Sequence, residues 1–296
     1  MQPSALWITV PRLRARIIRH GVRGRQNVWR RAPSMESRPA LIFIGLVWAR
    51  AKADFGSRYA GSALGTLWNA LQPILTIAVF SAVFETILRV RLPKGDLPFG
   101  YTLYLCAGYF PWLAFSESMT LGAGAFLRNA QFIRKMPVPA YLFVADVVLT
   151  SFIFLAVNFA IFLLLSIFAG NPVSLTWALI PIIFLVLWVY TYCLGLIVGL
   201  VNTYFRDVGL AVPIILQLWM WMTPIVYPIE AVPESFQKLL MINPLTPVLA
   251  MLRDATLNGR MPARHDLTLT ALWTIVLIAL ATLAWRRLGR DVRDLL

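Results

Sequence analysis

The chain has 296 residues, of which 59% are hydrophobic and 14% are charged, and its formal net charge is +14. This composition excludes an ordinary water-soluble globular domain and indicates an integral membrane protein. A basic chain can also bind nucleic acid, but in a membrane protein the placement of the charges matters more than their sum, and we expect no nucleic-acid partner.

Residues 1–39 form a basic amino-terminal arm. Its first 35 residues contain eight arginines and no acidic residue, and they lack the apolar core and cleavage site of a secretory signal peptide. A mitochondrial transit peptide is one alternative. We favour a cytoplasmic arm held against anionic lipid headgroups.

Residues 40–57 predict an amphipathic helix in the membrane interface, because their apolar run is too short to cross and then meets charged residues. Arg50 and Asp54 share one face of this helix, and Trp48 favours the interfacial depth. A core helix of a small soluble domain is the alternative. The residues assigned to the interface helix and to substrate access are Trp48, Arg50, Asp54, Arg58 and Tyr59.

Six apolar stretches of spanning length follow. They lie near residues 66–88, 101–123, 140–168, 175–201, 208–229 and 267–285. If the amino terminus is inside, the inner segments contain 20 lysines and arginines and the outer loops contain seven. This bias predicts that both termini, including the tail 287–296, are cytoplasmic. We therefore predict an all-α, multi-pass protein whose transmembrane domain covers residues 40–290, with six spans within 66–286.

Three sequence motifs lie next to the predicted spans. The first turns the chain into span 1 and contains Arg58, Tyr59, Ser62, Leu64, Gly65, Trp68 and Pro73. The second, after span 4, is Tyr204-Phe205-Arg206-Asp207. The third, before the last span, is Asn243-Pro244-Leu245-Thr246-Pro247, followed by Arg253-Asp254 and Leu257-Asn258-Gly259.

In this order the motifs resemble those of the membrane subunits of ABC-type polysaccharide exporters, the permeases for O-antigen, capsule and teichoic acid. The resemblance covers residues 40–290, whereas the long arginine-rich arm departs from shorter family members. It implies a homodimer and a separate nucleotide-binding subunit in two copies. It also implies that ATP and Mg are bound by that partner and that this chain binds no cofactor.

The chain encodes no ATPase of its own. A phosphate-binding loop needs Gly-Lys-Ser/Thr, and none of the four lysines follows a glycine. The two cysteines and two histidines are solitary, which predicts neither a metal site nor a histidine-based catalytic site. We therefore expect a transport subunit that is not an enzyme.

The cytoplasmic segment 126–137 predicts a short helix that ends before Pro137. An apolar ridge beside cationic side chains suits docking on an ATPase, and the resemblance implies a coupling helix here. An ordinary positive-inside loop is the alternative. The coupling candidates are Arg128, Gln131, Phe132, Ile133, Arg134, Lys135 and Met136, with Arg206 and Asp207 as a second contact or a local ion pair.

Glu117 falls within the predicted second span and Asp146 within the third. A carboxylate at the centre of a membrane helix costs about 2.5–3.5 kcal/mol, so we expect both near the cytoplasmic helix ends. Pairing with Arg128 or Arg134, or a hydrated vestibule, is favoured over a proton relay.

Aromatic rings can bind the C–H faces of sugars without fixing a linkage. The candidates for lining a glycan channel are Trp68, Trp188, Tyr192, Trp219 and Tyr227. Packing in the core or in an aromatic belt is the alternative for each ring.

We expect prolines at 213, 224 and 228 to interrupt the fifth helix, and residues 230–259 are too polar to cross. They predict an external re-entrant helical hairpin between helices 5 and 6, which the resemblance assigns to an outer gate. The gate candidates are Pro224, Pro228, Phe236, Pro244 and Pro247. Surface packing without gating is the alternative.

These features predict a permease protomer that dimerises around a pathway, with spans 1 and 5 at the dimer seam and channel wall. The resemblance implies export of an undecaprenyl-linked polysaccharide across the bacterial inner membrane, driven by closure of two ATPase subunits. We favour O-antigen, and hence a place in lipopolysaccharide biosynthesis. An ABC exporter of drugs or small lipids and a membrane-embedded glycosyltransferase are the alternatives.

Overall fold

The computed structural model describes residues 45, 68–87, 99–135, 139–289 and 291–296. The chain divides into two compact units, residues 1–50 and 51–296. Gly45, in a helix, is the residue described in the first unit. The predicted interface-helix residues Trp48, Arg50, Asp54, Arg58 and Tyr59 lie outside the described residues.

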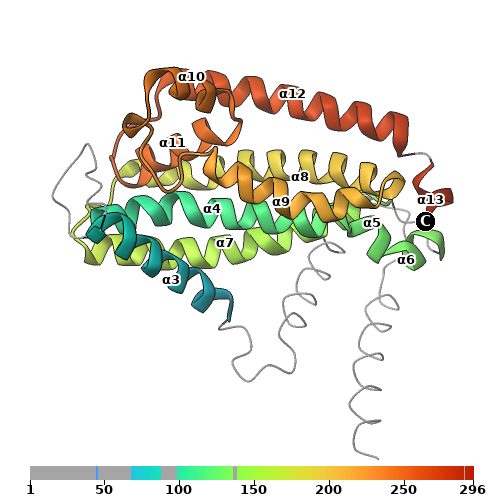
Figure 1. Cartoon of the computed structure of the whole chain (residues 1–296), viewed down its shortest axis with the longest axis horizontal. Helices are drawn as coiled ribbons and strands as arrows, with labels where there is room; N and C mark the ends of the chain where they lie inside the picture. Colours follow the sequence, from blue (N-terminus) through green and yellow to red (C-terminus); the bar gives the residue numbers. More distant parts are fainter. Residues whose placement is uncertain (1–44, 46–67, 88–98, 136–138, 290) are drawn as a thin grey trace, which may run out of the picture. The chain divides into compact units, whose positions relative to one another are not determined.

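The described part of the second unit consists of helices and connecting turns, without a strand (Figure 1). Its longer helices are α3 (Trp68–Ser81), which continues as η3 (Ala82–Ile87), α4 (Gly100–Ala123), α7 (Leu142–Phe168), α8 (Ile180–Tyr204), α9 (Asp207–Trp221) and α12 (Arg264–Leu288). The shorter ones are α5 (Ala125–Arg128), α6 (Ala130–Lys135), η4 (Leu175–Leu179), η5 (Ile229–Ala231), α10 (Glu234–Ile242), α11 (Leu245–Thr256) and α13 (Val292–Leu295).

Three helical stretches in the described ranges are long and apolar enough to cross a membrane. They are Leu142–Phe168, Leu175–Tyr204 and Arg264–Leu288. Helix α9 is apolar but has 15 residues, about 22 Å at 1.5 Å per residue, which is less than the ~30 Å hydrocarbon core. Over the residues that it describes, the structure thus confirms an all-helical protein with several apolar helices, whereas six crossings remain a prediction.

The core forms where α4, α7 and α8 pack together, with α12 against α8 and α9 against α4 (Figure 1). Glycines allow α4 and α8 to approach closely: a Cβ atom built on Gly199 would lie 3.0 Å from the carbonyl oxygen of Gly122. A Cβ atom built on Gly122 would in turn lie 3.5 Å from the Cα of Gly195, one turn away on α8. Such close backbone packing contributes to helix association in lipid, where apolar side chains gain little from leaving the solvent.

Helix α9 differs from the predicted fifth span in two ways. Pro213 lies inside a continuous helix, so the prediction that it interrupts the helix is wrong. The helix ends at Trp221 and not near residue 229, because Pro224 cannot donate a backbone hydrogen bond and disfavours helical geometry in the residue before it. Residues 222–228, which we call the turn segment, therefore leave the helix before Pro224 and Pro228.

Candidate functional site

The turn segment is non-helical backbone, and most of its residues are buried. Thr223, Pro224, Ile225, Val226 and Pro228 are all buried. Backbone polar groups that have left a helix must find other partners, and at membrane depth an unsatisfied carbonyl is especially costly. The partners of this segment are therefore the first question to ask of the site.

Three side chains from two other helices supply hydrogen bonds to four consecutive carbonyls. Arg253 of α11 donates from Nη1 to the oxygen of Pro224 at 2.7 Å and from Nη2 to the oxygen of Ile225 at 3.0 Å. On α4, the Tyr101 hydroxyl donates to the oxygen of Val226 at 2.7 Å. The Tyr104 hydroxyl donates to the oxygen of Tyr227 at 3.2 Å. We call Tyr101, Tyr104 and Arg253 the carbonyl clamp.

Arg253 is the centre of the clamp. Only 7% of its surface is exposed, and its guanidinium carbon lies 3.6 Å from the centroid of the Tyr104 ring, a cation–π arrangement. Burial lowers the pKa of Arg253, but the ordinary value for arginine is so high that the side chain stays charged. A fixed charge thus joins α11 to the end of α9 and to α4.

Asn243 satisfies the start of the turn segment. Its amide nitrogen donates to the oxygen of Met222 at 3.2 Å and to Oγ1 of Thr223 at 2.8 Å. Its amide oxygen accepts from the indole of Trp219 and from the backbone nitrogen of Leu245, both at 3.1 Å. The asparagine of the third sequence motif therefore connects α9 to the start of α11.

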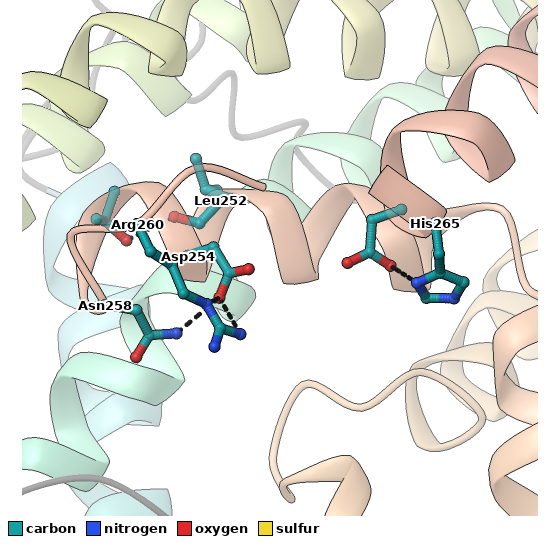
Figure 2. A network of polar contacts seen from close by, with 7 residues as sticks. Leu252, Asp254, Asn258, Arg260 and His265 are labelled. Atoms are coloured by element: carbon teal, nitrogen blue, oxygen red, sulfur yellow. Dashed lines mark hydrogen bonds and ion pairs between the residues drawn. The ribbon is translucent and has the colours of Figure 1, made fainter. Parts of the chain in front are cut away.

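A second polar network lies beyond the clamp, where α11 leads into α12. Oδ1 of Asp254 accepts from Asn258 at 2.7 Å and forms an ion pair with Arg260 at 2.8 Å (Figure 2). Nδ1 of His265 lies 3.2 Å from a carboxylate oxygen of Asp266. Figure 2 shows Arg260 and Asn258 converging on Asp254, with His265 at a separate point of the network.

This network borders a partly open cavity of about 470 Å³, which is lined by the first turn of α4, the turn segment, η5, α10, α11 and the start of α12. We call it the hairpin cavity. Tyr104 and Arg253 of the clamp also line it, so the clamp and the cavity share a wall.

An open groove of about 390 Å³ runs between α4 and α9. The buried Trp112 lies in it, and its polar residues come from both helices: Ser116, Glu117 and Thr120 from α4, and Gln217 from α9. We call this the α4–α9 groove. Gln217 was not predicted as a pathway residue, whereas Glu117 was expected to pair with Arg128 or Arg134 or to line a hydrated vestibule. Residues 113, 116, 117 and 120 follow the spacing of one helix face.

The predicted aromatic lining residues whose side chains are described contact other residues of the same chain. Trp188 and Tyr192 stack on each other at 5.3 Å with nearly parallel rings. Trp219 meets Phe115 edge to face and is hydrogen-bonded to Asn243. The Tyr227 hydroxyl donates to the oxygen of Trp221 at 2.6 Å. Trp68 begins α3, and its side chain lies outside the described residues.

The predicted coupling segment forms two short helices, α5 and α6, and not one. The chain breaks at Asn129, whose side chain donates to the oxygen of Ala125 at 2.8 Å. Ile133 is 1% exposed, so the prediction that it contributes to an exposed ridge is wrong: its side chain packs into the core. Phe132 is partly buried against the same core.

The exposed members of the coupling group are cationic or polar: Arg128, Gln131, Arg134 and Lys135, with Arg206 and Asp207 exposed at the start of α9. Arg128 also turns back to donate to the oxygen of Leu121 near the end of α4. Met136 lies outside the described residues.

The five gate candidates differ in how far their side chains are buried. Pro224, Pro228 and Pro247 are buried, Pro244 is partly buried, and Phe236 is 60% exposed. The residues that hold this region together, Tyr101, Tyr104 and Arg253, were not assigned a role from the sequence. The available signal was an Arg-Asp pair, 253–254, inside an otherwise apolar amphipathic helix, since such a charge is retained only with partners.

A family model described as ABC-2 type transporter matches residues 45–257. The O-antigen export system permease protein RfbA of Klebsiella pneumoniae is 31% identical over 208 residues, which cover 70% of this chain and 78% of that protein. The protein of the same name from Myxococcus xanthus is 28% identical over 79% of this chain and 88% of its own length. The polysialic acid transport protein KpsM of Escherichia coli is 25% identical over 79% of this chain and 89% of its own length.

Proposed function

Because this chain belongs to the ABC-2 type transporter family, we propose that it is the permease subunit of an ATP-driven exporter of a lipid-linked polysaccharide. The names of its relatives, which are O-antigen export permeases and a polysialic acid transport protein, support a glycan as the substrate. The sequence identity is greater to the O-antigen permeases than to the polysialic acid transport protein, which favours O-antigen as the substrate. We place the transporter in the bacterial inner membrane.

The α4–α9 groove is the observation that carries the choice of substrate class. Glu117 lies within α4 and lines the groove together with Thr120 and Gln217, so this face of the helix presents polar groups and is not purely apolar. A sugar polymer can exchange hydrogen bonds with Glu117, Gln217 and Thr120, whereas an apolar drug or a lipid tail cannot.

We test the proposal in a bacterial strain that lacks this permease. The strain should accumulate undecaprenyl-linked glycan on the cytoplasmic side, and the wild-type chain should restore export. Gln217→Leu should lower the export rate about three- to tenfold, because a net hydrogen bond contributes roughly 0.5–1.5 kcal/mol. Surface glycan and intracellular lipid-linked glycan are both measured.

Two threonines provide a matched control. Thr120 and Thr282 are both exposed and both donate to the carbonyl four residues before them, but Thr120 lines the groove and Thr282 does not. Thr120→Val should slow export and Thr282→Val should not. Normal glycan export in the deletion strain would reject the glycan function and leave the drug or small-lipid exporter. Glycan that is never polymerised there would favour the glycosyltransferase.

The coupling residues support a site for the energy-supplying partner. We propose that two ATPase subunits, which bind ATP and Mg, dock on the exposed cations of α5 and α6 and on Arg206 and Asp207. Closure of these subunits would push on α5, α6 and the interface helix 40–57 of a permease homodimer, and open a pathway beside spans 1 and 5. The tagged chain should then co-purify with a nucleotide-binding protein.

We further propose six spans with both termini in the cytoplasm and α10–α11 as the external hairpin and gate. Lys238→Cys on α10 should react with a membrane-impermeant maleimide added to intact spheroplasts. Lys135→Cys on α6 should react only after permeabilisation. The two native cysteines are buried, which limits background labelling. The opposite labelling pattern would reverse the topology.

A further inference from the structure

The hairpin cavity has the dimensions of a small-molecule site. Its volume of about 470 Å³ falls within the 300–1,000 Å³ typical of ligand pockets. Its lining combines apolar side chains, such as Leu103, Met241 and Leu257, with the polar side chains of Asp254, Arg260 and Asp266. A ligand that fits this lining must have an apolar surface and several hydrogen-bonding groups.

Among the residues that the structure describes, the cavity lining contains three acids, two arginines and one histidine. Asp254 is paired with Arg260 at 2.8 Å, and Asp266 lies against His265 at 3.2 Å. The remaining guanidinium, Arg253, donates to two carbonyls, and Glu230 is the remaining acid in the lining. A phosphate would meet three carboxylates, and a divalent cation would compete with Arg260 for Asp254. The arrangement therefore favours an uncharged ligand.

We propose that the hairpin cavity binds one uncharged sugar ring, a unit of the exported polymer, at the predicted external side of the protein. Neighbouring hydroxyl groups of the sugar can donate hydrogen bonds to the carboxylates of Glu230 and Asp266. They can also accept hydrogen bonds from Arg260 and Asn258, and hydrogen bonds to such charged groups are stronger than those between neutral groups. The C–H face of the ring packs on the apolar side chains of the lining. This inference rests on the proposed function, because it takes the exported glycan as the source of the sugar.

Binding of a sugar ring in the hairpin cavity can affect the turn segment directly. Pro224, Tyr104 and Arg253 line the cavity and also belong to the clamp or to the segment that it holds. A sugar in the cavity therefore contacts the side chains that fix the end of α9. The cavity is an exit-side subsite whose occupancy stabilises the clamped arrangement.

The test uses the full-length chain, purified in nanodiscs with its ATPase partner, and four neutral sugars as probes: galactose, mannose, rhamnose and N-acetylglucosamine. Saturation-transfer NMR should show saturable binding of at least one of them. Glu230→Ala should weaken that binding about tenfold, since it removes a charged acceptor. Glu234→Ala is the matched control, because both acids are exposed in the first turn of a short helix and only Glu230 lines the cavity.

A second variant fills the cavity without touching the charges. Ala250→Leu adds side-chain volume where α11 lines the cavity and should abolish sugar binding. Thermal unfolding should show that the variant is still folded. Absence of saturable binding to the wild type would overturn the proposal, as would displacement of the sugar by millimolar phosphate or Mg²⁺ or equal weakening by Glu230→Ala and Glu234→Ala. Glycan accumulation in the deletion strain is measured separately, so loss of the subsite leaves the export function standing.

Discussion

Arg253→Met is expected to abolish export and to destabilise the protein by about 2–4 kcal/mol. The substitution keeps a long, flexible side chain but removes both donors to the carbonyls of Pro224 and Ile225. Each buried carbonyl left without a partner costs roughly 1–3 kcal/mol, and relief from burying a charge offsets part of this cost. Thermal unfolding in detergent measures the stability, and surface glycan measures the export.

Gly108→Ala tests the clamp without changing Arg253 itself. A Cβ atom on Gly108 would lie 2.5 Å from Nη2 of Arg253, so the guanidinium must move away from the oxygen of Ile225. Export should fall in this variant too. Arg286→Met, at an exposed position in the last turn of α12, should change stability by less than about 0.5 kcal/mol. Full export with Arg253→Met would show that the clamp is dispensable.

The second large effect is expected at the crossing of α4 and α8. Gly199→Val should destabilise the protein by about 1–3 kcal/mol or more, because the new Cβ would lie 3.0 Å from the backbone oxygen of Gly122 and 3.2 Å from the Phe126 ring. A backbone oxygen cannot rotate out of the way, so the two helices must separate. Thermal unfolding and the yield of folded protein in detergent report this change.

Gly195→Ala is the matched control on the same helix, four residues away. Its Cβ would meet the Val144 side chain at 3.4 Å, an ordinary contact. Replacing a helical glycine by alanine is otherwise favourable by roughly 0.5–1 kcal/mol, so this variant should be neutral or slightly more stable. Equal losses at both positions would argue against backbone contact as the cause.

The helices could be predicted from the sequence because the length of an apolar run depends only on consecutive residues. The stretches 140–168, 175–201 and 267–285 correspond to helices that can cross a membrane. The end of α9 was predicted about eight residues late. The apolar run continues through 222–226, and hydropathy does not distinguish lipid-facing helix from buried turn.

The roles of individual site residues were harder to predict from the sequence. The aromatic rings were chosen for their affinity for sugars, yet Trp219 is held by Asn243 and by Phe115, which come from other helices. Ile133 looked like part of an exposed ridge because the segment is short and cationic, but it packs inward. Both outcomes depend on neighbours distant in the chain.

The amino-acid sequence alone determined that this protein is helical, lies in a membrane and resembles glycan-export permeases, since composition, span length and motif order are properties of consecutive residues. Only the tertiary structure decided what Arg253, Tyr101 and Tyr104 do. Their partners are carbonyls some 28 to 125 residues away, and every residue type offers the same carbonyl, so no sequence pattern marks it. The same holds for the α4–α9 groove and the hairpin cavity, which exist only where separate helices meet.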